Sequence, residues 1–269
     1  PQPLIEQYAI AVLPHVLIWD QQAYRDRIDL QPADFYHRLR TEKELPTTAQ
    51  ASVMSFSDAF EQARASGAEA VVAILLNSKF SGALQSARQA AETARLPVHI
   101  HDSRNVTMGL GWQVLAAARA RDAGGGVEDI LAAACRVRDR VQLYICLDTL
   151  EYVARGGRIG NASRMLGAML NIKPVIFVDP HTGTVEPAGM AVTRHKAVDL
   201  LYRKFFNLLD GQQNMHIAVL HGDAAGEAAA LYERVFREKV PAEMLTNITG
   251  PVLGINTGPQ TLALCGYGE

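Results

Sequence analysis

The sequence predicts an α/β protein of two domains: an N-terminal doubly wound parallel sheet and a C-terminal α+β domain with a mixed or antiparallel sheet. Strand-like and helix-like patterns alternate through residues 1–148, which is the βαβ order of a parallel sheet. Residues 71–76 form a continuous apolar run, as in a strand covered on both faces. Two strand-like pieces flank the turn at 181–183, which indicates a hairpin. With 269 residues available, we expect one domain at 1–148 and another at 149–269.

In the first half, helices are expected where apolar residues recur with helical spacing, and strands where short apolar runs stand between turn signals. Ser55 is a suitable cap for one helix, and Gly67 ends it. The expected order is a helix at 1–7, a strand within 8–19, a helix at 55–66, a strand at 68–76, a helix at 81–94, a strand at 97–100, a helix at 108–121, a helix ending at 137 and a strand at 141–147.

The second half has a different order of elements, because two strand-like pieces there follow each other without a helix between them. That spacing suggests antiparallel pairing. The expected order is a helix at 162–170, strands at 173–179 and 184–191, a helix at 194–209, a strand at 216–221, a helix at 225–238, and short apolar pieces at 243–248 and 251–255.

Composition excludes several classes of protein. A formal net charge of −2 and a pI of about 6.5 argue against a protein that wraps duplex DNA or coats an anionic membrane. No apolar run approaches the ~20 residues of a membrane span, so we expect a soluble protein. Three cysteines without C-x-x-C spacing favour a reducing, cytoplasmic setting. The chain starts at Pro1 without a methionine, and we expect a preceding segment.

Polar loops at the ends of strands carry the candidate binding groups. Residues 46–52 supply hydroxyls, among them Thr47 and Thr48, although such a stretch is also typical of a plain loop. Residues 77–83 follow the apolar strand and open a helix, which makes them a candidate anion seat. Neither G-x-x-x-x-G-K-S/T nor G-x-G-x-x-G occurs, so no nucleotide cofactor is indicated.

Two further features are ambiguous by themselves. The run Arg155-Gly156-Gly157-Arg158 is a bend between permanent cations, suited to an anion or to the acidic surface of a partner. His99 and His101 lie at alternate strand positions beside Asp102, but no third ligand follows with sensible spacing, so no metal site is expected.

Taken in order, the motifs resemble those of the DegV family of bacterial fatty-acid-binding proteins. The resemblance extends over nearly the whole chain, and the family's opening strand with its Thr-Asp-Ser turn would lie before Pro1. The matching motifs are Thr48-x-Gln50, Asn77-Ser78-Lys79-Phe80-Ser81-Gly82 with Ser86-Ala87, Asp102-Ser103 with Met108-Gly109-x-Gly111, Leu150-Glu151-Tyr152 leading to Gly156-Gly157-Arg158-Ile159, Leu170-Asn171-Ile172-Lys173-Pro174, and Gly250-Pro251 with Thr257-Gly258-Pro259.

The resemblance implies a lipid carrier rather than an enzyme. It implies one long-chain fatty acid, such as palmitate, stearate or oleate, held between the two domains, with its carboxylate presented to a fatty acid kinase that makes the acyl phosphate. No cofactor and no nucleic acid are implied. The head group would be bound by Thr48 and Ser78, with contributions from Thr47, Asn77, Ser81, Gly82 and Asn256. Arg158, followed by Arg155 and Arg194, would dock the kinase.

The chain departs from the family pattern at four positions. Ala49 and Asn77 stand where serines are common, and Asn256 and Gln260 replace the histidine and the last glycine of His-Thr-Gly-Pro-Gly. A histidine can donate a charged hydrogen bond, whereas Asn256 donates only a neutral one. We therefore expect a weaker or rearranged head-group site.

Two alternative functions remain open from the residues themselves. One is an enzyme acting on a carboxylated or phosphorylated small molecule at the Ser78 to Gly82 loop, with His101 and Asp102, or His221 and Asp223, as acid–base groups. The other is a protein-interaction scaffold without a cavity.

Overall fold

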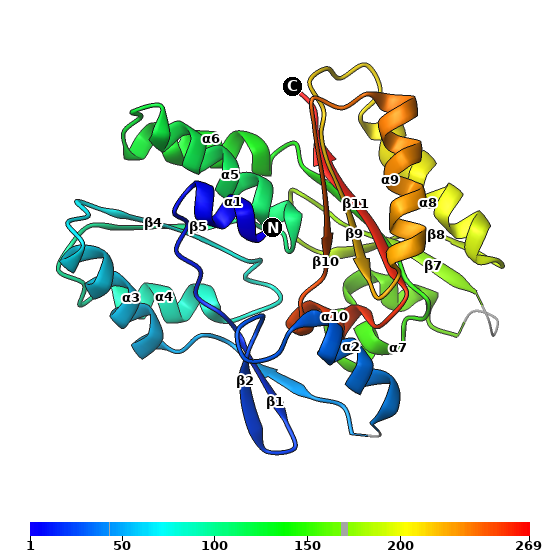
Figure 1. The fold of residues 1–269 in the computed structure, drawn as a ribbon, viewed down its shortest axis with the longest axis horizontal. Helices are drawn as coiled ribbons and strands as arrows, with labels where there is room; N and C mark the ends of the chain where they lie inside the picture. The colour runs from blue at the N-terminus through cyan, green and yellow to red at the C-terminus, as the bar shows by residue number, and fades with distance from the viewer. Residues whose placement is uncertain (43, 168–171) are drawn as a thin grey trace.

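A six-stranded mixed sheet forms the larger part of the protein (Figure 1). The computed structural model describes residues 1–42, 44–167 and 172–269. Neighbouring strands of this sheet are antiparallel, except for one parallel pair at the β10 edge. In spatial order the strands are β10 (Glu243–Ile248), β9 (His216–Gly222), β11 (Thr261–Tyr267), β6 (Gln142–Cys146), β7 (Lys173–Val178) and β8 (Val185–Ala191).

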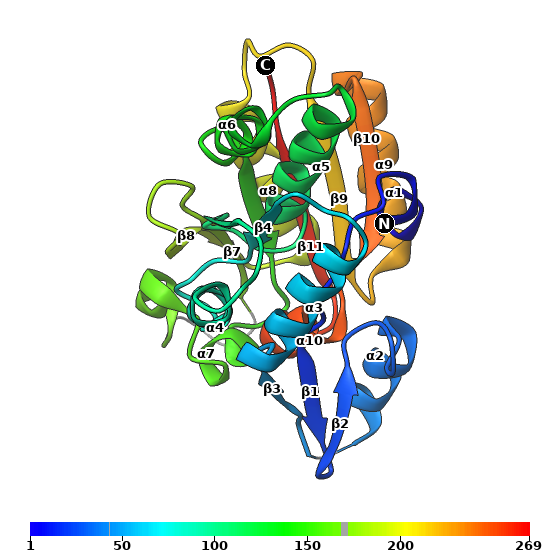
Figure 2. The same cartoon turned by 90° about the vertical axis from the view of Figure 1, so that its left-hand side faces the viewer.

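Helices cover both faces of this sheet (Figures 1 and 2). One face packs against α8 (Arg194–Leu208) and α9 (Ala225–Lys239), where Phe205 and Leu231 are buried. The other face packs against α5 (Met108–Asp122), whose Trp112 is buried. The helix α9 crosses over from β9 to β10, which makes that pair parallel.

Half-buried polar contacts attach α5 to the β10 edge of the sheet. Arg119 donates to Glu243 at 2.7 Å, and the Nδ1 atom of His216 lies 2.8 Å from the other carboxylate oxygen. Burial acts to raise the pKa of Glu243, but the hydrogen bonds from His216 and Arg119 outweigh it and lower that pKa to about 2.

The N-terminal part contains a parallel pair of strands, β4 (Val71–Leu75) and β5 (Val98–Asp102). The helices α3 (Val53–Ala65) and α4 (Ala83–Ala91) pack on this pair, and α6 (Val127–Arg138) lies against α5. The α/β fold class is therefore confirmed, with parallel pairing in the first part and a mixed sheet in the second. Helices lie on both sides of β4, as expected for 71–76, with α3 and α4 on one side and α5 and α6 on the other (Figure 1). All five residues of β4 are nevertheless only half-buried, in a sheet of two strands.

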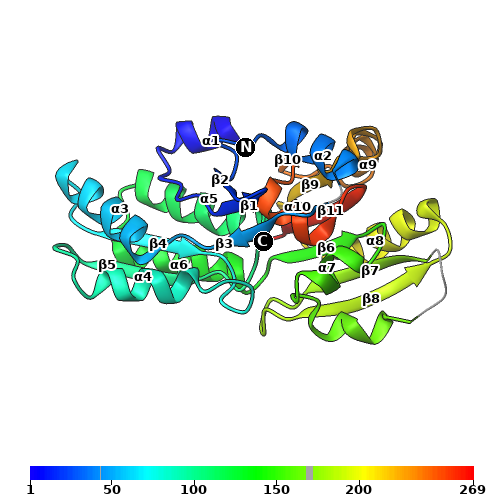
Figure 3. The same cartoon turned by 90° about the horizontal axis from the view of Figure 1, so that it is seen from below.

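A small antiparallel sheet was not predicted. It has the order β2 (Gln22–Arg25), β1 (Val16–Trp19) and β3 (Thr47–Ala49), with α2 (Pro32–Thr41) packed beside it. β1 contacts the helix α10 (Pro251–Thr257), and the chain leaving β3 contacts α4, so this sheet connects the two larger parts (Figure 3). The helix α1 (Gln2–Gln7) precedes it, as expected.

Three sequence-based assignments need correction. The strand expected at 141–147 does not join the N-terminal sheet, because β6 pairs with β11 and β7. The expected apolar piece at 251–255 is the helix α10, since Pro251 sits in its first turn, where a missing N–H costs nothing. Where a helix was expected at 162–170, the described residues form a 3₁₀ helix, η1 (Gly160–Met165), preceded by α7 (Glu151–Arg155), and residues 168–170 lie outside the described ranges. Leu170 and Asn171 lie outside the described residues, and the domain boundary near 150 stays a prediction.

None of the helices in the described residues is both long enough and apolar enough to cross a membrane.

Candidate functional site

Three segments meet at the start of α4. The Nε2 atom of Gln50, just after β3, donates to the hydroxyl of Ser86 on α4 at 3.1 Å. Gln50 also lies against Gly82, where an added Cβ would approach its Oε1 to 2.4 Å, so any larger residue would have to displace the Gln50 side chain. The Nε2 atom of His15, from the segment before β1, lies 3.1 Å from the hydroxyl of Ser81. The Thr-x-Gln motif and the Ser81-Gly82 motif therefore lie next to each other in the fold.

Thr48 belongs to β3, where it is paired with Leu17 of β1. Its side chain is half-buried, whereas that of Thr47 is exposed. Because alternate residues of an extended chain face the same way, Thr48 lies on the side of β3 from which Gln50 reaches α4. Thr47 points to the opposite side.

Ser78 faces a carboxylate. Its hydroxyl donates to Asp102 at 2.6 Å, and the backbone N–H groups of Ser78 and Arg104 donate to the same carboxylate. Asp102 is thus a local acceptor that holds the loops after β4 and β5 together. Ser78 can donate to a ligand only if it releases Asp102.

Asn77 is 1% exposed, and its carboxamide is fully engaged. Its Nδ2 atom donates to the carbonyls of Gly183 at 2.6 Å and Arg104 at 3.2 Å, while its Oδ1 accepts from the N–H of Lys79. An added Cβ at Gly183 would lie 2.8 Å from Nδ2. Asn77 therefore connects the end of β4 to the turn between β7 and β8, and both of its donors are used.

Arg158 and Asn256 approach the same region from the C-terminal half. Arg158 donates from Nε to the carbonyl of Phe80 at 3.2 Å and from a terminal nitrogen to that of Gly156 at 2.5 Å. A Cβ on Gly156 would lie 2.1 Å from Oδ1 of Asn256, whose Nδ2 donates to the carbonyl of Val252. The glycine thus allows α10 to approach the bend closely.

The other two predicted docking arginines are ion-paired. Arg155 is exposed and donates to Glu151 at 2.5 Å. Arg194 donates to Glu227 at 2.9 Å and lies beside the buried thiol of Cys146, which belongs to the core under α8. Arg155 and Arg158 are therefore presented by one bend, and Arg194 by another part of the molecule.

Apolar side chains around this region remain incompletely buried. They come from the N-terminal segment, the end of β4, the loops around α7 and the helix α10, and they pack against the same core as Trp112. Each would lose further contact with water if an apolar ligand covered it. They include Leu4, Ile10, Leu76, Phe80, Leu150, Ile159 and Leu253.

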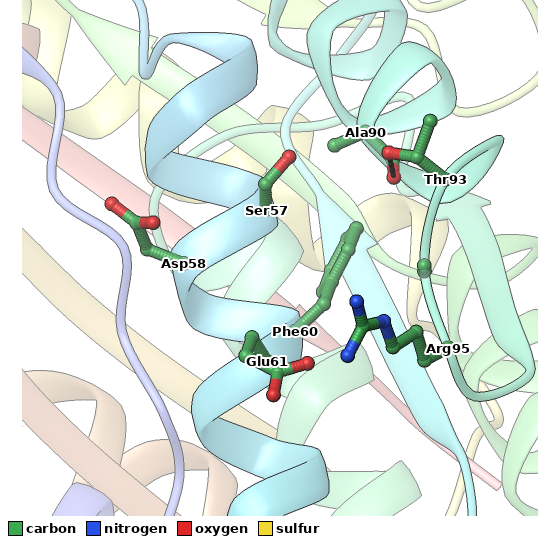
Figure 4. Close-up of a pocket in the computed structure, with 8 residues that line it drawn as sticks. Ser57, Asp58, Phe60, Glu61, Ala90, Thr93 and Arg95 are labelled. Atoms are coloured by element: carbon green, nitrogen blue, oxygen red, sulfur yellow. Dashed lines mark hydrogen bonds between the residues drawn. The ribbon is translucent and has the colours of Figure 1, made fainter.

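Two surface depressions lie away from these residues. One, of about 400 Å³, is formed between α3 and the end of α4, and Phe60 points into it between Ser57 and Arg95 (Figure 4). The other, of about 770 Å³, lies between β8 and α8 and includes Met190 and Arg203. Neither contains a predicted site residue.

The acid–base pairs of the enzyme alternative do not form. The side chain of His101 contacts Gln113, while Asp102 accepts from Ser78 and backbone N–H groups. His221 accepts a backbone N–H through Nδ1, and Asp223 pairs with Arg40. Burial lowers the pKa of both histidines. No group of three or more metal-ligating side chains occurs within the described ranges.

His15 is the site residue that sequence reasoning missed. It follows Pro14 in a segment interpreted only as β-prone, and no motif marks it. Its neighbour Ser81 lies 66 positions further along, so only the fold brings them together. Burial lowers the pKa of His15, which favours the neutral ring.

Comparison with known proteins gives a consistent result. A family model described as "Uncharacterised protein, DegV family" matches residues 1–269. A DegV domain-containing protein of Streptomyces coelicolor is 30% identical over 266 residues, which is 98% of this chain and 93% of that protein.

Solved structures agree with the sequence matches. A DegV family protein from Thermus thermophilus, described for its fatty acid binding, is 31% identical with a TM-score of 0.93, covering 100% of this chain and 95% of that one. DegV from Bacillus subtilis, described as a fatty acid binding protein, is 26% identical with a TM-score of 0.89, covering 100% of this chain and 95% of that one.

Proposed function

Because this chain belongs to the DegV family, we propose that it binds one long-chain fatty acid and presents the carboxylate to a fatty acid kinase. Relatives at 31% and 26% identity are described as fatty acid binding, which supports the lipid. The observation that carries the proposal is the group of half-buried apolar side chains next to an uncharged cluster of hydroxyls and amides.

The acyl tail would supply most of the affinity. Burying a chain of about sixteen carbons at ~0.8 kcal/mol per methylene gives on the order of 10 kcal/mol before ordering costs. A tail over Leu76, Phe80 and Leu253 would cover apolar surface that the protein itself leaves half-exposed. A charged anchor is therefore unnecessary, and neutral donors suffice for the head group.

For the head group, we assign the leading roles to Thr48 and Ser81. Ser81 accepts from the N–H of Ala83 at 3.2 Å, and when neutral His15 donates through Nε2, the Ser81 hydroxyl proton is free for a carboxylate. Gly82 lets the side chain of Gln50 lie against the helix start beside Ser81. Ser78 would join only after exchanging its bond to Asp102, and Asn77 would shape the loop rather than touch the ligand.

Kinase docking is assigned to Arg158 and Arg155, which are exposed on the bend beside Phe80. We leave Arg194 out of this role because its side chain is only 21% exposed, is ion-paired with Glu227 and lies on another part of the molecule. Acyl-phosphate formation would be the kinase's chemistry, so the protein acts as a carrier. The three cysteines are free, which suits the reducing cytoplasm, and we place the protein there.

Fatty acid binding is tested on purified protein stripped of lipid. Native mass spectrometry with added palmitate should show one bound molecule, and calorimetry should give one site. The double variant Thr48→Val with Ser81→Ala should weaken binding about tenfold or more, because each hydroxyl donates to a charged group, while thermal unfolding changes little. Ser57→Ala, in the depression of Figure 4, is the matched control and should bind as the wild type does.

Two results would contradict the proposal. Folded protein that takes up no fatty acid removes the carrier function altogether. Unchanged palmitate affinity in the double variant removes the head-group assignment but leaves the carrier function. Kinase docking is tested separately: Arg158→Ala should retain palmitate and lose acyl-phosphate formation with kinase and ATP, whereas Arg95→Ala should retain both.

A further inference from the structure

A cysteine, a histidine and a glutamine form a chain of contacts that includes none of the residues assigned to the lipid. Cys135 lies on α6, His101 is the last residue but one of β5, and Gln113 lies on α5. The sulfur of Cys135 is 3.8 Å from Nδ1 of His101, and Nε2 of the same ring is 2.8 Å from Oε1 of Gln113. A nucleophile, a base and a group that orients the base are the three parts of an activated nucleophile.

The contacts of Gln113 determine which ring nitrogen of His101 carries the proton. The Nε2 atom of Gln113 donates both hydrogens, to the carbonyls of Ser103 at 3.0 Å and Gly109 at 2.7 Å. Its Oε1 atom is therefore the end that faces His101, and an amide oxygen only accepts. Neutral His101 must then carry its proton on Nε2 and present a bare Nδ1 to the thiol. The imidazole is aligned to accept the proton of Cys135.

The surroundings favour the neutral base at rest. His101 is 5% exposed, and burial, with Arg138 and Arg104 nearby, lowers its pKa, while Gln113 and Asp102 act in the opposite direction. A neutral imidazole at pH 7 is ready to accept a proton.

Accessibility distinguishes Cys135 from the other two thiols. It is half-buried, whereas Cys146 and Cys265 are 0% exposed. A reagent must be small to reach a sulfur beside a buried histidine. Small peroxides meet that condition.

We propose that Cys135 is an oxidation site for small peroxides, with His101 as its general base and Gln113 as the positioning residue. His101 takes the thiol proton on Nδ1, and the sulfur attacks one peroxide oxygen. The O–O bond breaks, and the leaving hydroxide recovers the proton from His101 as water. Sulfur is oxidised to sulfenic acid and the peroxide is reduced. This chemistry is separate from fatty acid carriage and does not depend on it.

The test treats folded protein with hydrogen peroxide and traps sulfenic acid with dimedone, and peptide mass spectrometry locates the adduct. We expect adduct on Cys135 and none on Cys146 or Cys265, which serve as internal controls. His101→Gln should slow labelling about tenfold or more, since a general base is removed. His195→Gln, which changes a largely exposed histidine, should label at the wild-type rate. Equal rates for His101→Gln and wild type would overturn the proposal.

A second measurement needs no variant, in case His101→Gln does not fold. The rate of Cys135 oxidation is compared at one pH in native protein and in protein unfolded by urea. Burial alone would make the oxidation of Cys135 slower in the native protein than in the unfolded protein. A faster native rate supports activation by His101, and an equal or slower one refutes it.

Discussion

The hydroxyl pair of Tyr36 and Thr249 lends itself to a direct stability measurement. The two oxygens are 2.5 Å apart, and the residues are 1% and 4% exposed. Burial raises the pKa of Tyr36 to about 12, so the phenol stays protonated throughout the usual range. It also fills the space beside Gly222 and Gly254, where an added Cβ would lie 2.7 and 2.8 Å from the phenol oxygen. The bond fastens α2 to the segment between β10 and α10.

Tyr36→Phe should therefore cost more than an average hydrogen bond. The phenyl ring keeps the packing but leaves the hydroxyl of Thr249 buried without this partner, at a cost of about 2 kcal/mol. For a chain of this size that lowers Tm by about 4–8 °C. Tyr24→Phe is the control, because Tyr24 bonds only the exposed Gln22 and should change Tm by less than about 2 °C.

Thermal unfolding followed by circular dichroism measures these values. The double variant Tyr36→Phe with Thr249→Val should recover part of the loss, because neither buried oxygen is then left alone. A single variant as stable as the wild type would refute the reasoning. So would a double variant whose loss equals the sum of the two single losses.

Two further predictions concern the site and the sheet edge. In Gly82→Ala the new Cβ would lie 2.4 Å from Oε1 of Gln50, so the variant should displace Gln50 and break its bond to Ser86. Calorimetry should then show palmitate binding weakened about tenfold. The control is Gly226→Ala, where nothing lies within 4 Å of the added Cβ, and it should bind palmitate normally. Because the folded pKa of Glu243 is about 2, below its ordinary 4.5, its contribution to stability is present above about pH 4.5 and is lost as the pH falls toward 2. Urea unfolding of Glu243→Gln should consequently show a smaller loss of stability across that window, and an identical loss would contradict the assignment.

Local pattern predicted most of the elements, because their signals are contained in neighbouring residues. The helices α5, α6, α8 and α9 appear where the apolar spacing places them. Sheet membership is different, because it depends on partners far along the chain. β6 reads like any buried strand, and its neighbour β11 lies more than a hundred residues later. The strand β3 was not predicted because Thr47 and Thr48 are as typical of a loop as of a strand.

The site shows the same division between local and distant information. The motifs singled out residues that the fold brings together at the start of α4, namely Ser81, Gly82 and Gln50, and their role in binding stays a prediction. The family resemblance ranked Ser78 above Ser81, and the sequence could not show that Ser78 donates to the carboxylate of Asp102, because Asp102 belongs to another strand. Nor could it foresee the ion pair that occupies Arg194.

The carboxamide of Asn77 has a mechanical consequence. It contacts the backbone at Gly183, Arg104 and Lys79, so the loop after β4, the loop after β5 and the β7–β8 turn cannot shift independently. A serine, expected at this position from the family resemblance, has a single O–H to donate and could not serve both carbonyls. Asparagine at position 77 therefore adds a hydrogen-bonded connection between the parallel pair and the turn that leads to the edge strand β8.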